Sequence, residues 1–333
     1  MTTPLLTLTD RGLHCPDGDF TIDPWRKVDR AIITHGHGDH ARNGMGHYWT
    51  AAPGVPILRK RLGQYSPVEG VPYGERRSFG AVTVSFHPAG HILGSAQVRV
   101  QRGDEIWVVT GDFKREPDPT CAPFETVPCD VLVTEATFAY PIYQWPDPDT
   151  VMKEIYAWWQ RCAAEDRPAV LYTYALGKAQ RILAGLHAFT NETVWLHGAI
   201  DGLTRLYRDA GITMIPTVPV SEMPRSDRGA GRLILAPPSA AGSKWAKRFR
   251  GASTGFASGW MQVRGTRRRK GYDEGFVLSD HADWPGLLRT VEDSGAKRVL
   301  ATHGHTDALL AHLQGLGIEA QALATPYGET EEG

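Results

Sequence analysis

The sequence predicts an α/β protein made of two structural units. Its 333 residues exceed what one hydrophobic core usually organises. Short strand patterns separated by turns fill the first part, and a Pro- and Tyr-rich connector follows at 141–148. Beyond this connector, strand and helix patterns alternate, which is typical of a largely parallel sheet.

The elements of the first part are short strands. Residues 81–86 alternate valine or phenylalanine with small or polar residues, the period of a half-buried strand. Residues 105–110 and 130–134 are β-rich runs, each followed closely by an acidic residue. Carboxylates that follow strands are typical of active sites, because strands hold the loops after them rigidly.

The middle part begins with a predicted helix at 150–162, whose apolar residues recur at helical spacing. Strands are then expected at 169–174, 194–197 and 232–236, and helices at 177–189 and 202–210. This alternation predicts a doubly wound unit. The last part returns to strands at 275–278 and 298–301 and helices at 285–293 and 306–316.

Composition indicates a cytoplasmic protein. The four cysteines form no Cys-x-x-Cys pair, so neither a disulfide framework nor a zinc–thiolate site is expected. The N-terminus has no secretory signal pattern, and no apolar run approaches the roughly 20 residues that span a bilayer. We therefore expect no membrane association.

Candidate metal ligands are concentrated in His35-Gly36-His37-Gly38-Asp39-His40, directly after the apolar run 31–33. Imidazole and carboxylate ligands suit zinc or manganese, and the glycines would let the backbone fold tightly around an ion. One ion would struggle to use four groups from so short a loop, whereas two adjacent ions could share them. An incidental polar loop explains this density of ligands poorly.

Further ligands follow other strands. His91 and Asp112 each come after a strand pattern, and a carboxylate can bridge two ions about 3.5–4 Å apart. Alone, His91 could be a core histidine and Asp112 a turn residue. His281 and His303 follow the strands of the last part, and one could bind metal while the other acts as general acid. Glu135 could hold such an acid histidine in its working tautomer.

In this order, Asp23, His-x-His-x-Asp-His, His91 and Asp112 resemble the metallo-β-lactamase fold. The continuation Glu135, His281 and His303 resembles its β-CASP branch, which processes nucleic acids and includes ribonuclease J and Artemis. The segments 175–180 and 257–261 also resemble β-CASP signatures. The chain also resembles the bacterial DNA-ligase-associated exonucleases. The resemblance implies an αββα metallo-β-lactamase sandwich at 1–145 and 275–333, with an α/β β-CASP domain inserted at 146–274.

The resemblance also implies residue roles. His35, His37 and His91 would bind one divalent ion, Asp39, His40 and His303 a second, and Asp112 would bridge the two. Asp23 would order the first loop from behind the ligands. His281, supported by Glu135, would protonate the leaving oxygen, so that Asp39, Asp112, His281 and Glu135 form the catalytic set. One departure concerns the substrate: Artemis-like DNA nucleases lack a histidine matching His303, whereas RNA-processing members have it.

Charge is unevenly distributed along the chain. The formal net charge is −1, yet residues 228–272 contain eleven Lys or Arg and no Asp or Glu. Such residues would neutralise phosphates, and the aromatics Trp245, Phe249, Phe256, Trp260 and Tyr272 could stack on bases. Some of these aromatics are equally well explained as core. The expected substrate contacts are Lys178, Ser239, Ser258, Arg267, Arg268 and Arg269.

Four functions remain open from the sequence. A DNA exonuclease acting in repair, together with a DNA ligase and helicase, is the favoured hypothesis. An RNA-processing nuclease is supported by His303. A metallohydrolase of small esters or amides would need no basic stretch, and a catalytically dead nucleic-acid scaffold would need no complete ligand set.

Overall fold

The computed structural model describes residues 4–263, 265 and 271–324, and these divide into two compact units. Unit 1 comprises Met1–Tyr143 and His281–Gly333, as far as these ranges are described. Unit 2 spans Gln144–Asp280. One unit is therefore inserted into the chain of the other.

Unit 1 contains two sheets. The first has the order β1 (Thr7–Leu8), β2 (Leu13–Cys15), β3 (Phe20–Ile22), β4 (Arg30–Ile32), β5 (His47–Ala51), β6 (Val68–Val71). The second has the order β19 (Glu319–Ala322), β18 (Arg298–Thr302), β11 (Val131–Glu135), β10 (Glu105–Val109), β9 (Ala96–Arg102), β8 (Val82–Pro88), β7 (Arg77–Phe79). Strands β10, β11, β18 and β19 run parallel to one another, while β7 to β10 form antiparallel pairs.

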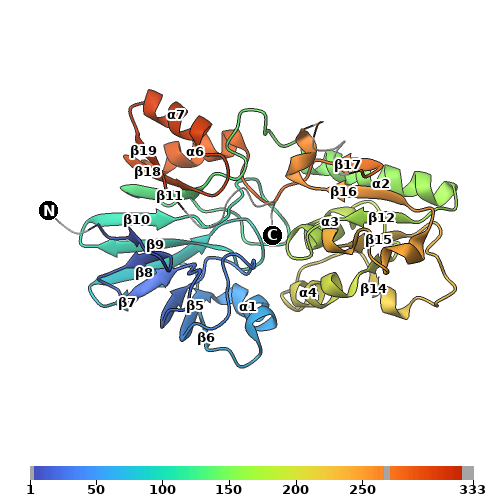
Figure 1. Ribbon diagram of the computed structural model, residues 1–333, viewed down its shortest axis with the longest axis horizontal. Coiled ribbons are helices and arrows are strands. Elements are labelled where there is room, and N and C mark those ends of the chain that lie inside the picture. Colours follow the sequence, from blue (N-terminus) through green and yellow to red (C-terminus); the bar gives the residue numbers. More distant parts are fainter. Residues whose placement is uncertain (1–3, 264, 266–270, 325–333) are drawn as a thin grey trace. The chain divides into compact units, whose positions relative to one another are not determined.

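The two sheets pack face to face through one apolar core. Ile22 and Ile32 of the first sheet and Val98 and Val133 of the second belong to this core, and all four are buried. Helix α1 (Val55–Leu62) covers the outer face of the first sheet through Leu58. Helices α6 (Trp284–Ser294) and α7 (Asp307–Gly315) cover the second sheet, beside β18 and β19 (Figure 1). The predicted αββα sandwich is confirmed.

Unit 2 is built on one parallel sheet, in the order β14 (Thr217–Pro219), β13 (Val194–Leu196), β15 (Leu233–Ala236), β12 (Ala169–Tyr172), β16 (Ser253–Ala257), β17 (Glu274–Phe276). Helices α2 (Pro148–Ala164), α3 (Lys178–Leu186) and α4 (Gly198–Asp209) lie next to one another in sequence order. A second core, on the other side of β12, includes Phe249 and Met261 from 3₁₀ turns at Ala246–Phe249 and Gly259–Gln262. The parallel sheet was predicted, whereas these turns were not.

Helix α2 illustrates how local sequence sets an element. Asp147 caps its N-terminus by accepting from the Thr150 amide at 3.0 Å, and Pro148 occupies the first turn, where no donor is needed. The predicted apolar face is buried, including Ile155 and Trp158. Trp158 also donates from Nε1 to Ser253 Oγ at 2.9 Å, which fixes the helix against β16.

One predicted boundary differs from the structure. The resemblance implies that the strand expected at 275–278 belongs to the first domain, but β17 pairs in parallel with β16 and so belongs to unit 2. The second segment of unit 1 therefore begins at His281 rather than at 275. Among the described helices, none is both long enough and apolar enough for a membrane crossing.

Substitution of Gly94 tests the packing of the loop that carries His91. Its φ is +77°, and a Cβ there would lie 2.2 Å from the backbone of Gly54. We expect Gly94→Ala to lower the free energy of unfolding by about 2–5 kcal/mol, because backbone strain and steric overlap add. Gly103→Ala is the matched control, because its φ is +58° with nothing within 4 Å, and it should cost only about 1–2 kcal/mol. Denaturant titrations that gave equal losses would contradict this account.

Candidate metal centre

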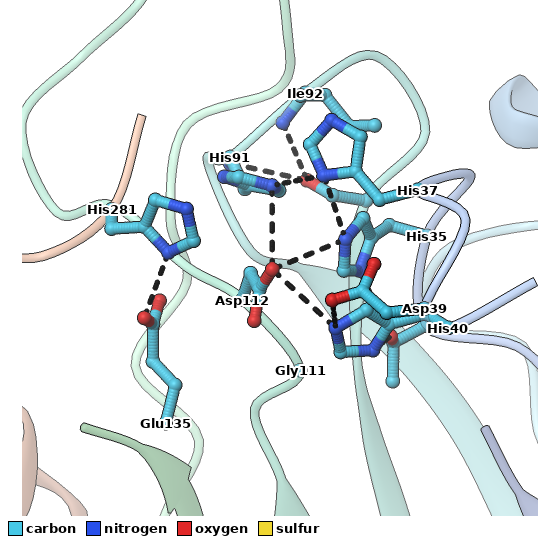
Figure 2. Close-up of polar contacts among 12 residues, drawn as sticks. His35, His37, Asp39, His40, His91, Ile92, Gly111, Asp112, Glu135 and His281 are labelled. Atoms are coloured by element: carbon cyan, nitrogen blue, oxygen red, sulfur yellow. Dashed lines mark hydrogen bonds and ion pairs between the residues drawn. The ribbon is translucent and has the colours of Figure 1, made fainter. Parts of the chain in front are cut away.

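The candidate ligands meet at one edge of the unit 1 sandwich. They lie in loops that follow strands of both sheets: His35, His37, Asp39 and His40 after β4, His91 after β8, Asp112 after β10, and His303 after β18. Figure 2 shows the side chains of His35, His37, Asp39, His40 and His91 turned towards Asp112. Two β-sheets therefore supply one cluster.

The first group consists of His35, His37, His91 and Asp112. His37 Nδ1 lies 3.1 Å from both His35 Nε2 and His91 Nε2, and Asp112 Oδ2 lies 3.3 Å from His35 Nε2 and 3.7 Å from His91 Nε2. Ligands about 2.0–2.1 Å from a tetrahedral ion would be separated by roughly 3.3–3.4 Å. These four atoms therefore have the spacing of one tetrahedral coordination shell.

The second group consists of Asp39, His40 and His303. His40 Nε2 lies 3.6 Å from Asp39 Oδ2 and 3.4 Å from Asp112 Oδ2, and the His40 and His303 rings stack at 5.4 Å between centroids. His40 Nε2 is buried and makes no hydrogen bond within the described residues. Asp112 Oδ2 faces both groups, so the donor set fits two neighbouring divalent cations that share one carboxylate.

A buried network behind the ligands orients them. Asp23 Oδ2 lies 2.7 Å from His40 Nδ1, which turns Nε2 towards the second group. Asp23 also accepts from the Thr34 amide at 2.8 Å and from the Thr34 hydroxyl at 2.6 Å. The same hydroxyl lies 3.1 Å from His35 Nδ1. Thr34 thus links Asp23 to residues of both ligand groups.

The supporting role of Thr34 is not predicted from the sequence, although this residue lies between the strand and the first histidine. The space that the Thr34 side chain occupies is left open by Gly111. A Cβ at Gly111 would lie 2.6 Å from Thr34 Cβ, and φ at this glycine is +56°. Glycine before Asp112 therefore leaves room for the Thr34 side chain.

Gly36 and Gly38 of the histidine motif are required for a different reason from the one expected. Neither Gly36 nor Gly38 has a positive φ, so tight backbone folding does not require them. A Cβ at Gly36 would instead lie 2.5 Å from Ile57 Cγ2 of α1, and one at Gly38 would lie 2.7 Å from Arg61 Nη2. These glycines give space to side chains of α1.

The charges in the cluster favour a cation beside Asp112. Burial lowers the pKa of His40, but the carboxylates of Asp112, Asp39 and Asp23 outweigh burial and hold that pKa well above its usual range. Burial raises the pKa of Asp112, but His40 and His35 outweigh it and hold that pKa well below its usual range. Burial and the neighbouring His281 hold the pKa of His91 well below its usual range. A proton on His40 or a bound cation would each supply the positive charge that Asp112 requires.

His281 and Glu135 form a separate pair in the same unit. His281 Nδ1 lies 2.8 Å from Glu135 Oε2, and Glu135 Oε1 accepts from the Phe113 amide at 2.8 Å. Both side chains are buried, and the His281 ring lies 4.7 Å from the His91 ring between centroids. Glu135 therefore fixes the orientation of the His281 ring through Nδ1.

The predicted substrate contacts of unit 2 differ in their exposure to solvent. Lys178 is only 1% exposed, with Nζ 3.8 Å from Asp280 Oδ2 and 4.5 Å from the Tyr174 ring centroid. Ser258 is buried, and its hydroxyl accepts from the Trp260 amide, whereas Ser239 is exposed. These surroundings do not favour Lys178 or Ser258 as phosphate contacts. Arg267, Arg268 and Arg269 lie outside the described residues.

Part of the acid-free basic stretch stabilises unit 2 itself. Arg248 donates to the carbonyls of four residues, Val220, Met223, Pro224 and Asp227. Arg232 pairs with Asp227 at 2.9 Å, and Phe249 and Phe256 are buried, as the core explanation of the aromatics requires. Lys244, Lys247 and Arg250 are exposed and remain available to a polyanion.

Comparison with known proteins identifies several proteins of similar sequence. The chain is similar to a probable DNA ligase of Opitutus terrae, with 32% identity over 94% of this chain and 30% of that protein. It is also similar to a ribonuclease of Thermus thermophilus, with 28% identity over 57% of this chain and 50% of the relative. Cleavage and polyadenylation specificity factor 73 of Drosophila melanogaster is 28% identical over 39% of this chain and 19% of its own length. The chain thus spans half or less of each relative.

A solved structure agrees with the fold. A protein of unknown function from Enterococcus faecalis V583 aligns with a TM-score of 0.56 and 13% identity, covering 82% of this chain and 74% of its own. No protein-family model matches the sequence. The αββα sandwich with its inserted α/β unit is the fold expected of the metallo-β-lactamase and β-CASP nucleases that the chain resembles.

Proposed function

We propose that this protein is a metal-dependent DNA exonuclease that hydrolyses phosphodiester bonds with two divalent cations, zinc or manganese. The single observation that carries the proposal is the position of Asp112 Oδ2, 3.3 Å from His35 Nε2 of one ligand group and 3.4 Å from His40 Nε2 of the other. A shared carboxylate between two such groups is the arrangement of many phosphate-cleaving enzymes.

In this proposal, His35, His37 and His91 hold one cation, Asp39, His40 and His303 hold the other, and Asp112 contacts both. When bound, the cations make hydroxide available near neutral pH and neutralise charge that develops on the phosphoryl oxygens. His281 protonates the departing sugar oxygen from Nε2, while Glu135 holds Nδ1 at 2.8 Å. Asp23 keeps His40 directed towards its cation.

DNA is favoured as the substrate because the similarity to the relative named as a probable DNA ligase extends over 94% of this chain. That similarity also supports a role in DNA repair beside a ligase. A helicase as a further partner is proposed from the resemblance to the DNA-ligase-associated exonucleases alone. RNA is the second candidate. His303 is the histidine that distinguishes RNA-processing β-CASP members, and several relatives are named as ribonucleases or endoribonucleases.

A label-release assay tests the substrate. Single-stranded DNA labelled at either end should be shortened by the purified protein with manganese or zinc, and Asp112→Ala should abolish this by removing the shared ligand. Asp104→Ala, at an exposed turn, is the control and should keep full activity. Much faster degradation of a matched RNA would overturn the DNA assignment, and the end that releases label first gives the direction.

The proton-donor role of His281 is tested by comparing two substrates whose leaving groups differ in their need for a proton. His281→Ala should lower kcat on DNA by about 10²–10⁴-fold, and Glu135→Gln should act in the same direction through the lost support of the ring. On the p-nitrophenyl ester of thymidine 5′-phosphate the loss should be far smaller, because p-nitrophenolate departs without protonation. Equal losses on both substrates would argue against proton donation.

Metal titration tests the support that Asp23 gives. Asp23→Asn should weaken binding of the second zinc or manganese ion by about 10–100-fold, measured by calorimetry or chelator competition. Asp10→Asn, which disturbs only an exposed ion pair with Arg26, is the control and should leave metal affinity unchanged. Unchanged affinity in Asp23→Asn would exclude this role.

A further inference from the structure

Arg61, in the last turn of α1, lies against the metal-ligand loop. The helix ends with three basic residues, Arg59, Lys60 and Arg61. The position that a Cβ on Gly38 would take is 2.7 Å from Arg61 Nη2 and 3.7 Å from Arg61 Cζ. Because Gly38 stands between His37 and Asp39, this guanidinium borders both candidate ligand groups.

The guanidinium forms no close ion pair within the described residues. Arg61 makes no ion pair or hydrogen bond there, although burial lowers its pKa and the nearby Asp39 carboxylate raises it. Two other arginines of unit 1 have close carboxylate partners: Arg102 pairs with Glu105 at 2.7 Å, and Arg115 pairs with Asp293 at 2.7 Å. The Arg61 side chain is exposed, so its guanidinium is accessible to an anion that approaches the ligand loop.

A purely structural role explains Arg61 less well than its neighbours. Basic residues in a last helical turn stabilise the helix end through its dipole, and Arg59 and Lys60 also supply this interaction. Arg59 donates to the Val68 carbonyl at 3.3 Å, which ties α1 to β6. Arg61 alone reaches back over the ligand loop, where Gly38 leaves it room.

We propose that Arg61 is a substrate-positioning residue that binds a phosphate of the nucleic-acid strand next to the scissile one. The inference rests on the proposed phosphodiesterase function and specifies which group holds the strand beside the metal centre. A guanidinium offers paired donors that match two phosphate oxygens. Because the guanidinium lies against Gly38, at the edge of the ligand loop, the phosphate that it binds would lie beside the ligand groups.

Equilibrium binding gives a readout that is independent of turnover. Fluorescence anisotropy of the full chain with a labelled phosphorothioate oligonucleotide should show Kd raised by about 10–100-fold in Arg61→Ala, the usual effect of losing a charged hydrogen bond. The slope of log Kd against log salt should fall by about one. Lys60→Ala removes the same charge from an exposed neighbour and should change Kd by less than about threefold.

Gly38→Ala tests the geometry. The new methyl would displace the Arg61 guanidinium, so this variant should raise Kd as Arg61→Ala does. The double variant should be no weaker than Arg61→Ala alone, because both changes remove one interaction. Additive losses would mean that Gly38→Ala acts elsewhere and would overturn the assigned contact.

Turnover separates this contact from the scissile phosphate. For Arg61→Ala, KM on the oligonucleotide should rise with kcat little changed, and hydrolysis of the p-nitrophenyl ester of thymidine 5′-phosphate, which has one phosphodiester, should be unaffected. Unchanged oligonucleotide binding, an equal loss on the small ester, or reduced metal content or thermal stability would each overturn the inference. If the wild-type protein hydrolyses neither DNA nor RNA, the proposed function itself fails. If it does and Arg61→Ala binds normally, only the role of Arg61 fails.

Discussion

The buried carboxylate of Asp112 is the constraint on which the rest of unit 1 depends. A carboxylate away from water is stable only beside compensating charge or donors. His35, His40 and His91 supply nitrogen atoms within 3.3–3.7 Å of its Oδ2. Because these histidines follow β4 and β8 while Asp112 follows β10, both sheets must pack together before the carboxylate is satisfied.

That requirement links the sandwich core to the site. Asp23 follows β3 of the first sheet and accepts two hydrogen bonds from Thr34, which follows β4. Glu135 ends β11 of the second sheet and holds His281, the first residue of the returning chain segment. Strand ends therefore act as fixed points, and the loops between them carry the ligands. Insertion of unit 2 leaves this frame intact because the chain departs and returns at Tyr143 and His281, which lie in the same unit.

Much of the candidate centre could be predicted from the sequence because ligand type and spacing are local properties. The spacing of His35, His37, Asp39 and His40 allows two groups without knowledge of the fold. Tertiary features were harder to foresee. The β17 boundary depends on pairing with β16, and the burial of Lys178 depends on Asp280, a residue distant in the chain. Arg248 lies in the basic stretch that is predicted to contact nucleic acid, but it donates to backbone carbonyls. The distribution of charged residues in a sequence does not reveal such partners.

The glycines of the histidine motif show how one sequence feature can have a cause other than the obvious one. Backbone dihedrals do not require Gly36 or Gly38, whereas side chains of α1 do. Ile57 fills the space at Gly36 and anchors the loop to the apolar face of the helix. Arg61 occupies the space at Gly38, so the same packing that shapes the ligand loop brings a positive charge to its edge. The histidine motif therefore supplies the metal ligands and also the surface on which α1 packs. The helix can approach the ligands because Gly36 and Gly38 have no Cβ atoms.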